Sequence, residues 1–268
     1  MLDGYERYRS FRVGMPVEGV LCITLDRPGA LNALDKTAHA ELSAIWPQAD
    51  RDARVRSVLL NAEGRAFSAG GDFTFLQEVV GSHAARVKAW HEVRDFVHNI
   101  LNCTKPIVSA IQGPAVGGGL AAALLADISI ASRTARLLDG HTRLGVVPGD
   151  HALLIWPLLC SLAKVKYHLM LCEPLTGAEA ERIGLVSLAV DEAELQQKAL
   201  DTAARLAGGA PTALRWTKHA LNNWVRAAGP HFDTALALEL IGFGSPGAQE
   251  GLAALQERRR PDFRRGSE

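Results

Sequence analysis

Three consecutive glycines, Gly117–Gly119, stand between an apolar segment at 107–111 and an Ala/Leu-rich run. The apolar segment, the Gly113-Pro114 break and the Ala/Leu-rich run predict a strand, a turn and a buried helix. Glycines at a helix start let a ligand atom approach the backbone closely, and the first amides of the helix lack intrahelical partners. The helix dipole also favours negative charge there. The pattern predicts a site for a phosphate or an oxyanion, although tight helix packing also selects glycine.

A second glycine turn lies within residues 66–72 and contains Gly70 and Gly71, directly after an apolar segment at 56–61. Two strand-to-turn units could point two amide donors at one oxygen. A lone donor of this kind is worth about 2.7–4 kcal/mol in a transition state, so a pair would dominate the catalysis. The alternative is that both segments are only tight turns.

The surrounding pattern predicts an α/β fold that would position these turns. Short apolar segments alternate with helical stretches up to Asp191, after which helices dominate. Two capping boxes, Thr176 with Glu179 and Asp191 with Glu194, mark helix starts. The stretch at 207–211 is interpreted as a hinge. The predicted strands are 20–25, 55–60, 107–111, 128–131 and 186–190, and the predicted helices include 34–46, 82–101, 211–227, 231–243 and 249–260.

Composition narrows the function classes. The 268-residue chain has a formal net charge of zero, which argues against nucleic acid or an anionic membrane surface as the main partner. The first ten residues carry charges and no apolar core, so no signal peptide is predicted, and no apolar run reaches membrane-spanning length. The four cysteines lie far apart without a CxxC pair, which predicts free thiols and a cytoplasmic location.

Six segments together resemble one family. They are 25–34, 66–72, 105–127, 144–149, 175–186 and 250–263, and they match in order over nearly the whole chain. The chain resembles the crotonase superfamily, the enoyl-CoA hydratase/isomerase fold. The resemblance implies a spiral core of ββα units over 1–206. It also implies a C-terminal helical trimerisation region over 207–268, giving a homotrimer or a dimer of trimers. The late aromatic residues are consistent with such burial; they are Trp216, Trp224, Phe232 and Phe243.

The resemblance also implies a site. By position, the backbone amides of Gly71 and Gly118 form an oxyanion hole that polarises the thioester carbonyl of an acyl-CoA. Coenzyme A enters as part of the substrate, and neither a separate cofactor nor a metal is expected. Asp72 could bear on catalysis, but an aspartate in a glycine turn commonly satisfies local amides. The residues expected to border the bound substrate and its coenzyme A are Arg27, Ala30, Leu31, Asn32, Ala69, Gly70, Gly71, Asp72, Gly117 and Gly118.

The chain departs from the water-adding members at both of their glutamate positions, which here hold Ala121 and His141. Alanine cannot transfer a proton, and loss of a positioned acid–base group typically costs about 10²–10⁴-fold. His141 is the best substitute, because an imidazole titrates near neutral pH and either Asp139 or Asp150 could orient it. Asp150 precedes an apolar helix, so its alternative role is that of an N-cap.

Three functions stay open. The first is acyl-CoA chemistry, namely hydration, a double-bond shift or related enolate chemistry, with His141 moving the proton. The second is hydrolysis of a carbon–carbon bond in a cyclic β-diketone, because His141 and Asp150 also resemble a pair in the oxocamphor hydrolase branch. That branch is expected to carry a further histidine where this chain has Gly118. The third is a protein that only binds acyl-CoA.

Weaker candidates lie elsewhere. His91 and His98 share one face of the predicted helix at 82–101, which lines the acyl pocket in the family; a solvated face is the alternative. The arginines at 258–260 and at 264–265 could meet the phosphates of coenzyme A, of the same or a neighbouring subunit, or form a solvated basic tail.

Overall fold

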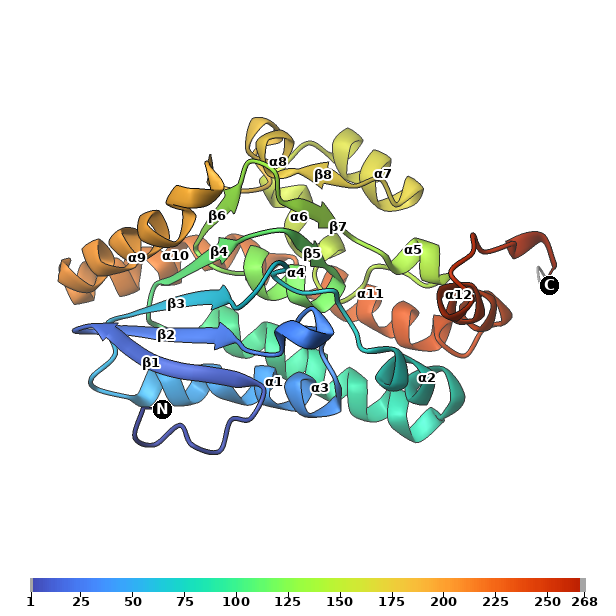
Figure 1. The fold of residues 1–268 in the computed structure, drawn as a ribbon, viewed down its shortest axis with the longest axis horizontal. Coiled ribbons are helices and arrows are strands. Elements are labelled where there is room, and N and C mark those ends of the chain that lie inside the picture. The colour runs from blue at the N-terminus through green and yellow to red at the C-terminus, as the bar shows by residue number, and fades with distance from the viewer. Residues whose placement is uncertain (1, 266–268) are drawn as a thin grey trace.

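The computed structural model describes residues 2–265, so residues 266–268 of the predicted C-terminal region lie outside it. Its centre is a six-stranded sheet in the order β1-β2-β3-β4-β6-β9 (Figure 1). β1 and β2 pair antiparallel, and each later pair is parallel. The strands are β1 (Phe11–Val17), β2 (Val20–Leu25), β3 (Ser57–Ala62), β4 (Ile107–Ile111), β6 (Ile128–Ser132) and β9 (Leu188–Val190).

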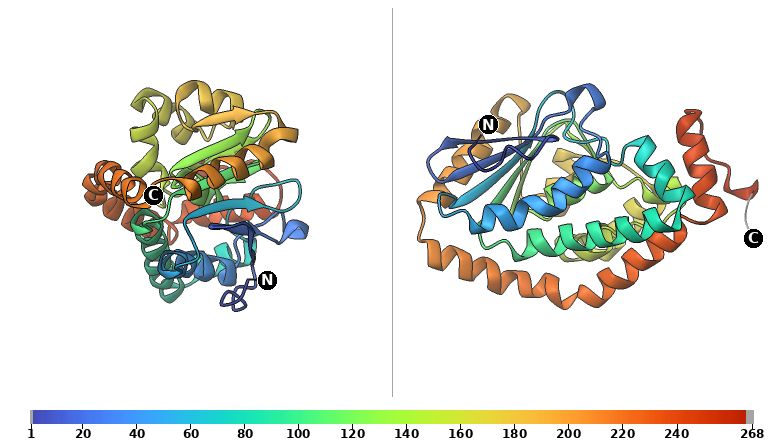
Figure 2. Two further views of the ribbon diagram at one scale, coloured as in Figure 1. Left: turned by 90° about the vertical axis from the view of Figure 1, so that its left-hand side faces the viewer. Right: turned by 90° about the horizontal axis from the view of Figure 1, so that it is seen from below.

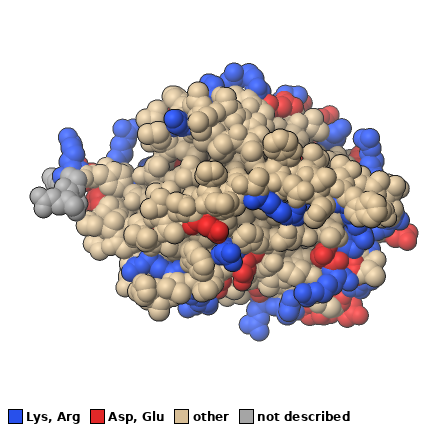
Figure 3. Space-filling view, turned by 180° about the vertical axis from the view of Figure 1, so that it is seen from behind, with Lys and Arg blue, Asp and Glu red and all other residues tan. Residues whose placement is uncertain are grey.

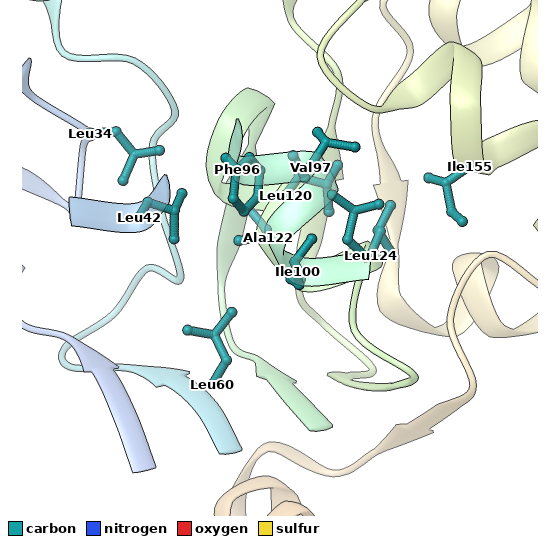
Figure 4. Packing of buried hydrophobic residues seen from close by; sticks show 14 of the residues in the cluster. Leu34, Leu42, Leu60, Phe96, Val97, Ile100, Leu120, Ala122, Leu124 and Ile155 are labelled. Atoms are coloured by element: carbon teal, nitrogen blue, oxygen red, sulfur yellow. The ribbon is translucent and has the colours of Figure 1, made fainter. Parts of the chain in front are cut away.

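The inner strands of this sheet are covered on both faces, which explains why they are almost uniformly apolar. Successive side chains of a strand point to opposite faces. Leu60 therefore joins the larger core with helices α1 (Lys36–Arg51) and α3 (His83–Asn102), while Leu59 packs with α9 (Glu192–Gly208) on the other face. Figure 4 shows the larger core from close by, with Leu60 and the α3 side chain Phe96 labelled in it.

A second, three-stranded sheet follows the first around the molecule. It contains β5 (Pro114–Val116), β7 (Arg136–Leu138) and β8 (Leu175–Thr176). An isolated bridge between Ser68 and Ala115 adds the earlier glycine turn to the same layer. Strand β4 is followed by β5 and then by helix α4 (Gly117–Leu124), and β6 is followed by β7 and then by α5 (His141–Leu144). The predicted α/β class is confirmed by this order.

The helices that follow α9 extend along one side of the molecule (Figure 2). Helix α10 (Pro211–Ala227) exposes Trp216 and Trp224, whereas α11 (Gly229–Gly242) buries Phe232. The view from behind shows broad stretches of surface without Lys, Arg, Asp or Glu (Figure 3). The remaining helices are α2 (Phe73–Gly81), α6 (Ala152–Leu159), α7 (Leu162–Leu171), α8 (Gly177–Ile183) and α12 (Pro246–Gln256).

The element predictions can be compared directly with this structure. The helix predicted at 211–227 coincides with α10, and the capping box of Thr176 with Glu179 is present at the start of α8. The second predicted capping box is wrong, because the Asp191 side chain caps no amide and instead pairs with Arg133 at 3.3 Å. No helix among residues 2–265 is both long enough and apolar enough to cross a membrane.

Candidate active site

Each of the three positions at the start of α4 favours glycine for a different structural reason. Gly117 adopts φ +47°, a left-handed conformation that side chains disfavour. A Cβ on Gly119 would lie 2.2 Å from Cβ of Ser68, so this glycine allows close packing of the helix. Between them, Gly118 is the second residue of the helix, and its N–H has no acceptor among the described residues. The middle glycine therefore presents a free donor.

The second glycine turn is joined through main-chain atoms to β5, the strand that leads directly into α4. Val116 donates its N–H to the carbonyl of Ser68 at 2.9 Å, and Ser68 donates to Pro114 at 3.1 Å. On the other side, Leu34 donates to Gly70 at 2.8 Å and accepts from Asp72 at 2.9 Å. This bridge passes over Gly71, whose own N–H has no acceptor within residues 2–265.

Two cavities meet at these glycines. An inner cavity of about 80 Å³ is enclosed mainly by apolar side chains of α1, α2, α3 and α11. An outer cavity of about 430 Å³ opens past Arg143 toward α12 and the segment after it. Gly71, Gly118 and His141 line both. The two free amides and the imidazole therefore stand at the passage from an open space to an apolar one.

His141 stands at the centre of a buried group of carboxylates. Its side chain is 11% exposed, and its Nδ1 lies 3.0 Å from Oδ1 of the fully buried Asp139 side chain. Its Nε2 lies 3.5 Å from Oε1 of Glu239 and 3.8 Å from Oδ2 of Asp150. The carboxylate of Asp139 orients the ring, which leaves Nε2 toward the inner cavity.

Charge within this group follows from the balance of burial and attraction. Burial opposes a charge on the imidazole, but the three carboxylates outweigh it and raise the pKa of His141 well above its ordinary value. At neutral pH His141 is therefore an imidazolium whose Nε2–H can be donated. Burial raises the pKa of Glu239, with help from Asp150 and Asp139, and His141 only partly offsets this. Burial works against a charge on Asp150 too, yet the adjoining imidazoles hold its pKa below the usual range.

Comparison with known proteins settles the family. The family model described as Enoyl-CoA hydratase/isomerase matches residues 16–266. This chain belongs to the enoyl-CoA hydratase/isomerase family. It is 36% identical over 251 residues to a probable enoyl-CoA hydratase of Bacillus subtilis, covering 91% of this chain and 95% of that protein.

Two further proteins are similar to this family member over most of the chain. It is 30% identical to the 1,2-epoxyphenylacetyl-CoA isomerase of Escherichia coli, covering 92% of this chain and 95% of the isomerase. The crystal structure of an enoyl-CoA hydratase/isomerase from Mycobacterium paratuberculosis superposes with a TM-score of 0.87 at 30% identity, covering 91% and 97% of the two chains. Membership in the crotonase superfamily, expected from the sequence, is confirmed.

In this enoyl-CoA hydratase/isomerase family member, Asp150 does not have the N-cap role considered from the sequence. The residue that precedes α6 is His151, and no side chain caps this helix. The Asp150 carboxylate instead accepts from Nδ1 of His151 at 2.8 Å. Trp156 donates its indole N–H to Nε2 of the same ring at 3.3 Å, which selects the tautomer that donates to Asp150.

Sequence reasoning did not find two titratable residues of the inner cavity. Glu239 comes from α11, where it is the single acidic residue of the apolar run 235–242, and that isolation was a usable signal. His39 comes from α1 and bonds through Nδ1 to Glu92 of α3 at 2.6 Å. Neither residue belongs to a motif, so its place could not be read from spacing.

The expected coenzyme A contacts divide into two groups. Ala69, Gly70 and Gly117 line the outer cavity. The residues of the Arg27 turn line neither cavity: Arg27 pairs with Asp35 at 3.0 Å, Leu31 accepts from Ala69, and Asn32 binds the carbonyls of residues 63 and 66. Ala30 is exposed beside them. This turn holds the glycine loop in place.

Other sequence candidates also have defined positions. Asp72 caps α2 by accepting from Thr74 at 3.0 Å, and Ala121 is fully buried in α4. His91 is exposed on α3, while His98 packs edge-on against Phe232.

Two of the C-terminal arginines lie at the outer cavity, and Arg260 and Arg264 do not line it. Arg258 and Arg259 line it, and Arg259 pairs with Glu250 and Glu257. Arg264 pairs with Asp262, and the side chain of Arg265 lies outside the described residues.

The group of carboxylates and imidazoles around His141 has the composition of a metal site. Ligand atoms of His141, Asp150 and Glu239 lie within 4.8 Å of one another, as do those of Asp139, Asp150 and His151. One imidazole and two carboxylates are a donor set that divalent metals accept. The expectation from the sequence was that no metal is bound, and chelation tests it.

Proposed function

We propose that this protein acts on an acyl-CoA thioester, whose carbonyl oxygen is bound by the amides of Gly71 and Gly118. The observation that carries the proposal is that both glycines and His141 line both cavities. A thioester joins an apolar acyl chain to a long polar carrier, so its carbonyl belongs at such a junction. The relatives named above, a probable enoyl-CoA hydratase and the 1,2-epoxyphenylacetyl-CoA isomerase, support this substrate class.

In this proposal His141 transfers the proton in place of the absent glutamates. Its imidazolium is fixed by Asp139 and presents Nε2–H at the inner cavity. Negative charge that develops on the carbonyl oxygen is met by two preorganised donors, and His141 protonates the α-carbon of the resulting enolate. The reaction is the addition of water to an α,β-unsaturated thioester or a shift of its double bond. We propose that no metal takes part, because a charged His141 does not offer Nε2 as a metal ligand.

The phosphates of coenzyme A would lie at the outer cavity. Arg143 and Arg258 line it and form no ion pair with any residue from 2 to 265. Guanidinium groups bind phosphate oxygens in charge-assisted hydrogen bonds. This supports a phosphorylated carrier over a neutral substrate.

A second candidate is hydrolysis of a cyclic β-diketone. The observation in its favour is the linked arrangement of Trp156, His151, Asp150 and His141, because an oriented carboxylate beside an imidazole can activate water. It leaves the outer cavity and its arginines without a role. We therefore prefer the thioester.

A ligand screen separates the possibilities. Thermal unfolding is measured with coenzyme A, crotonyl-CoA, longer enoyl-CoAs and a cyclic β-diketone. A ligand at a hundred times its dissociation constant stabilises the fold by about 2.7 kcal/mol, so the enoyl-CoAs should raise Tm and the diketone should not. Exchange of deuterium into a bound acyl-CoA then distinguishes an enzyme from a protein that only binds. Stabilisation by the diketone alone refutes the thioester proposal.

We also propose that the chain forms a homotrimer or a dimer of trimers. Trp216 and Trp224 of α10 are 72% and 73% exposed, and Ile241 of α11 is 74% exposed. Large apolar side chains gathered on neighbouring helices are typical of a surface that a partner covers. Light scattering on the purified protein measures the mass, and a monomer at micromolar concentration would contradict this assembly.

A further inference from the structure

Glu239 is buried where packing alone favours an apolar side chain. It lies on α11 in the run 235–242, whose other members are Ala, Leu, Ile and Gly, and the residue is 5% exposed. No Lys or Arg pairs with it within residues 2–265. Its charged neighbour is His141, and that one imidazole is shared with Asp139 and Asp150. A third buried carboxyl on one imidazole is destabilising, so its presence in the wall of the inner cavity calls for a chemical reason.

The two oxygens of this carboxyl have different surroundings. Oε1 lies 3.5 Å from Nε2 of His141. Oε2 is fully buried and has no hydrogen-bond partner among the described residues. Buried polar atoms are almost always paired, so an unpaired acceptor beside a cavity indicates a place for a donor that comes from outside the protein. Water or a substrate hydroxyl is such a donor.

We propose that Glu239 is the second catalytic residue of this site, the base that takes a proton from water while His141 supplies the other proton. This inference rests on the proposed acyl-CoA function. Water bound at Oε2 attacks the β-carbon of an enoyl thioester, and its proton passes to Glu239. The electron pair of the double bond moves to the carbonyl oxygen, held by Gly71 and Gly118. His141 then gives the proton on Nε2 to the α-carbon, and the carbonyl re-forms.

The same contact restores the resting state. After one turnover Glu239 holds a proton at Oε2 and His141 has lost one from Nε2. Rotation of the carboxyl group brings the protonated oxygen to the position of Oε1, which lies 3.5 Å from Nε2. Transfer of that proton returns both residues to their starting forms, and the sum of the steps is the addition of one water. The directions of the two pKa shifts agree with this division: His141 stays charged as the acid, and burial makes Glu239 a stronger base than an exposed carboxylate.

Several titratable groups surround the pair and must be considered in any pH profile. Asp139 faces Nδ1 of His141, and Asp150 faces Nε2 while bonded to His151. Across the inner cavity, His39 of α1 is bonded to Glu92 of α3. E239Q leaves all of these side chains in place and removes only the carboxylate of Glu239. Loss of the acid limb, rather than its displacement along the pH axis, is therefore the result assigned to Glu239.

The test compares E239Q with D233N. Asp233 lies on the same helix, is paired at the surface with Arg94 and lines neither cavity, so it controls for loss of a carboxylate from α11. Hydration of crotonyl-CoA is followed across pH, with binding of crotonyl-CoA and Tm measured in parallel. We expect E239Q to lower kcat by about 10²-fold or more, to remove the acid limb of the profile and to leave KM nearly unchanged. D233N should match the wild type.

Each other outcome has a defined meaning. If E239Q folds and keeps kcat within about threefold of the wild type, or keeps the acid limb, the inference is overturned. A wild type that binds crotonyl-CoA but adds no water also overturns it, and leaves the thioester proposal standing. A wild type that binds no CoA ester overturns the proposed function, and this inference with it. If E239Q lowers Tm but keeps the acid limb of the pH profile, Glu239 has a structural role only.

Discussion

Replacement of His141 by alanine tests the centre of the site. The change removes the imidazole that donates to Asp139 and faces the inner cavity. All other side chains that line the outer cavity are unchanged. Loss of a positioned acid lowers the rate by about 10²–10⁴-fold, which corresponds to about 2.7–5.5 kcal/mol of transition-state stabilisation. We expect turnover to fall by this factor while the affinity for coenzyme A stays within about twofold.

The same substitution should destabilise the fold, because it leaves the carboxylates of Asp139, Asp150 and Glu239 buried around a missing cation. Removing one partner of a buried charged group typically costs about 3–5 kcal/mol. Folding raises the pKa of His141 above its reference value of 6.5. The stabilisation is therefore fully present below pH 6.5 and is lost as pH rises through the folded-state pKa. Urea unfolding should show a gap between wild type and variant that has its full width at pH 6.5 and closes in alkaline buffer.

His91→Ala provides the control, since His91 is exposed on α3 and lines neither cavity. It should leave rate, affinity and stability unchanged. The reasoning fails if His141→Ala retains the wild-type rate. It also fails if the stability gap widens, rather than closes, as pH rises above neutrality, because the imidazole would then act through its uncharged form.

Three further outcomes can be checked independently. Gly119→Ala places a methyl group against Ser68 and should cost about 1–3 kcal/mol in urea unfolding; an unchanged midpoint would argue against the close packing. Arg143→Ala and Arg258→Ala should weaken coenzyme A at low salt but not a pantetheine ester, as calorimetry can show, and equal losses for both ligands would contradict a phosphate role. Chelation with EDTA should leave turnover unchanged; a loss restored by one divalent metal would mean that the carboxylates around His141 hold an ion.

The parts of the fold that the sequence predicted well are those whose chemistry is local. Strands buried on both faces need apolar residues throughout, so β2 and β4 were found with their observed bounds. The short strands β5 and β8 were missed, because two or three residues carry no periodicity. Tertiary contacts also override local signals. Asp191 has the same spacing to a glutamate as Thr176, but its side chain pairs with Arg133 instead.

The site shows the same division. The two glycine turns could be recognised because each is a contiguous pattern. The surroundings of His141 could be predicted only where they lie nearby in sequence: Asp139 was named as one of two orienting residues, and it is the one at hydrogen-bond distance from the ring. Glu239 comes from a late helix, and nothing in its segment indicates which residue it faces. Only the packing of α11 beside α6 and α3 brings it to the cavity.

The glycine turns are joined to each other by carbonyl and amide groups, from Leu34 through Ser68 to Val116. Two amide donors that are positioned by main-chain hydrogen bonds do not depend on which side chains surround them. Under the proposed function, exchange of the groups around the opening, such as His141 or Glu239, would change which proton moves and in which order, while the amides would still hold the substrate carbonyl. The scaffold thereby separates capture of a carbonyl from the choice of reaction, and this makes it a favourable starting point for designing new chemistry.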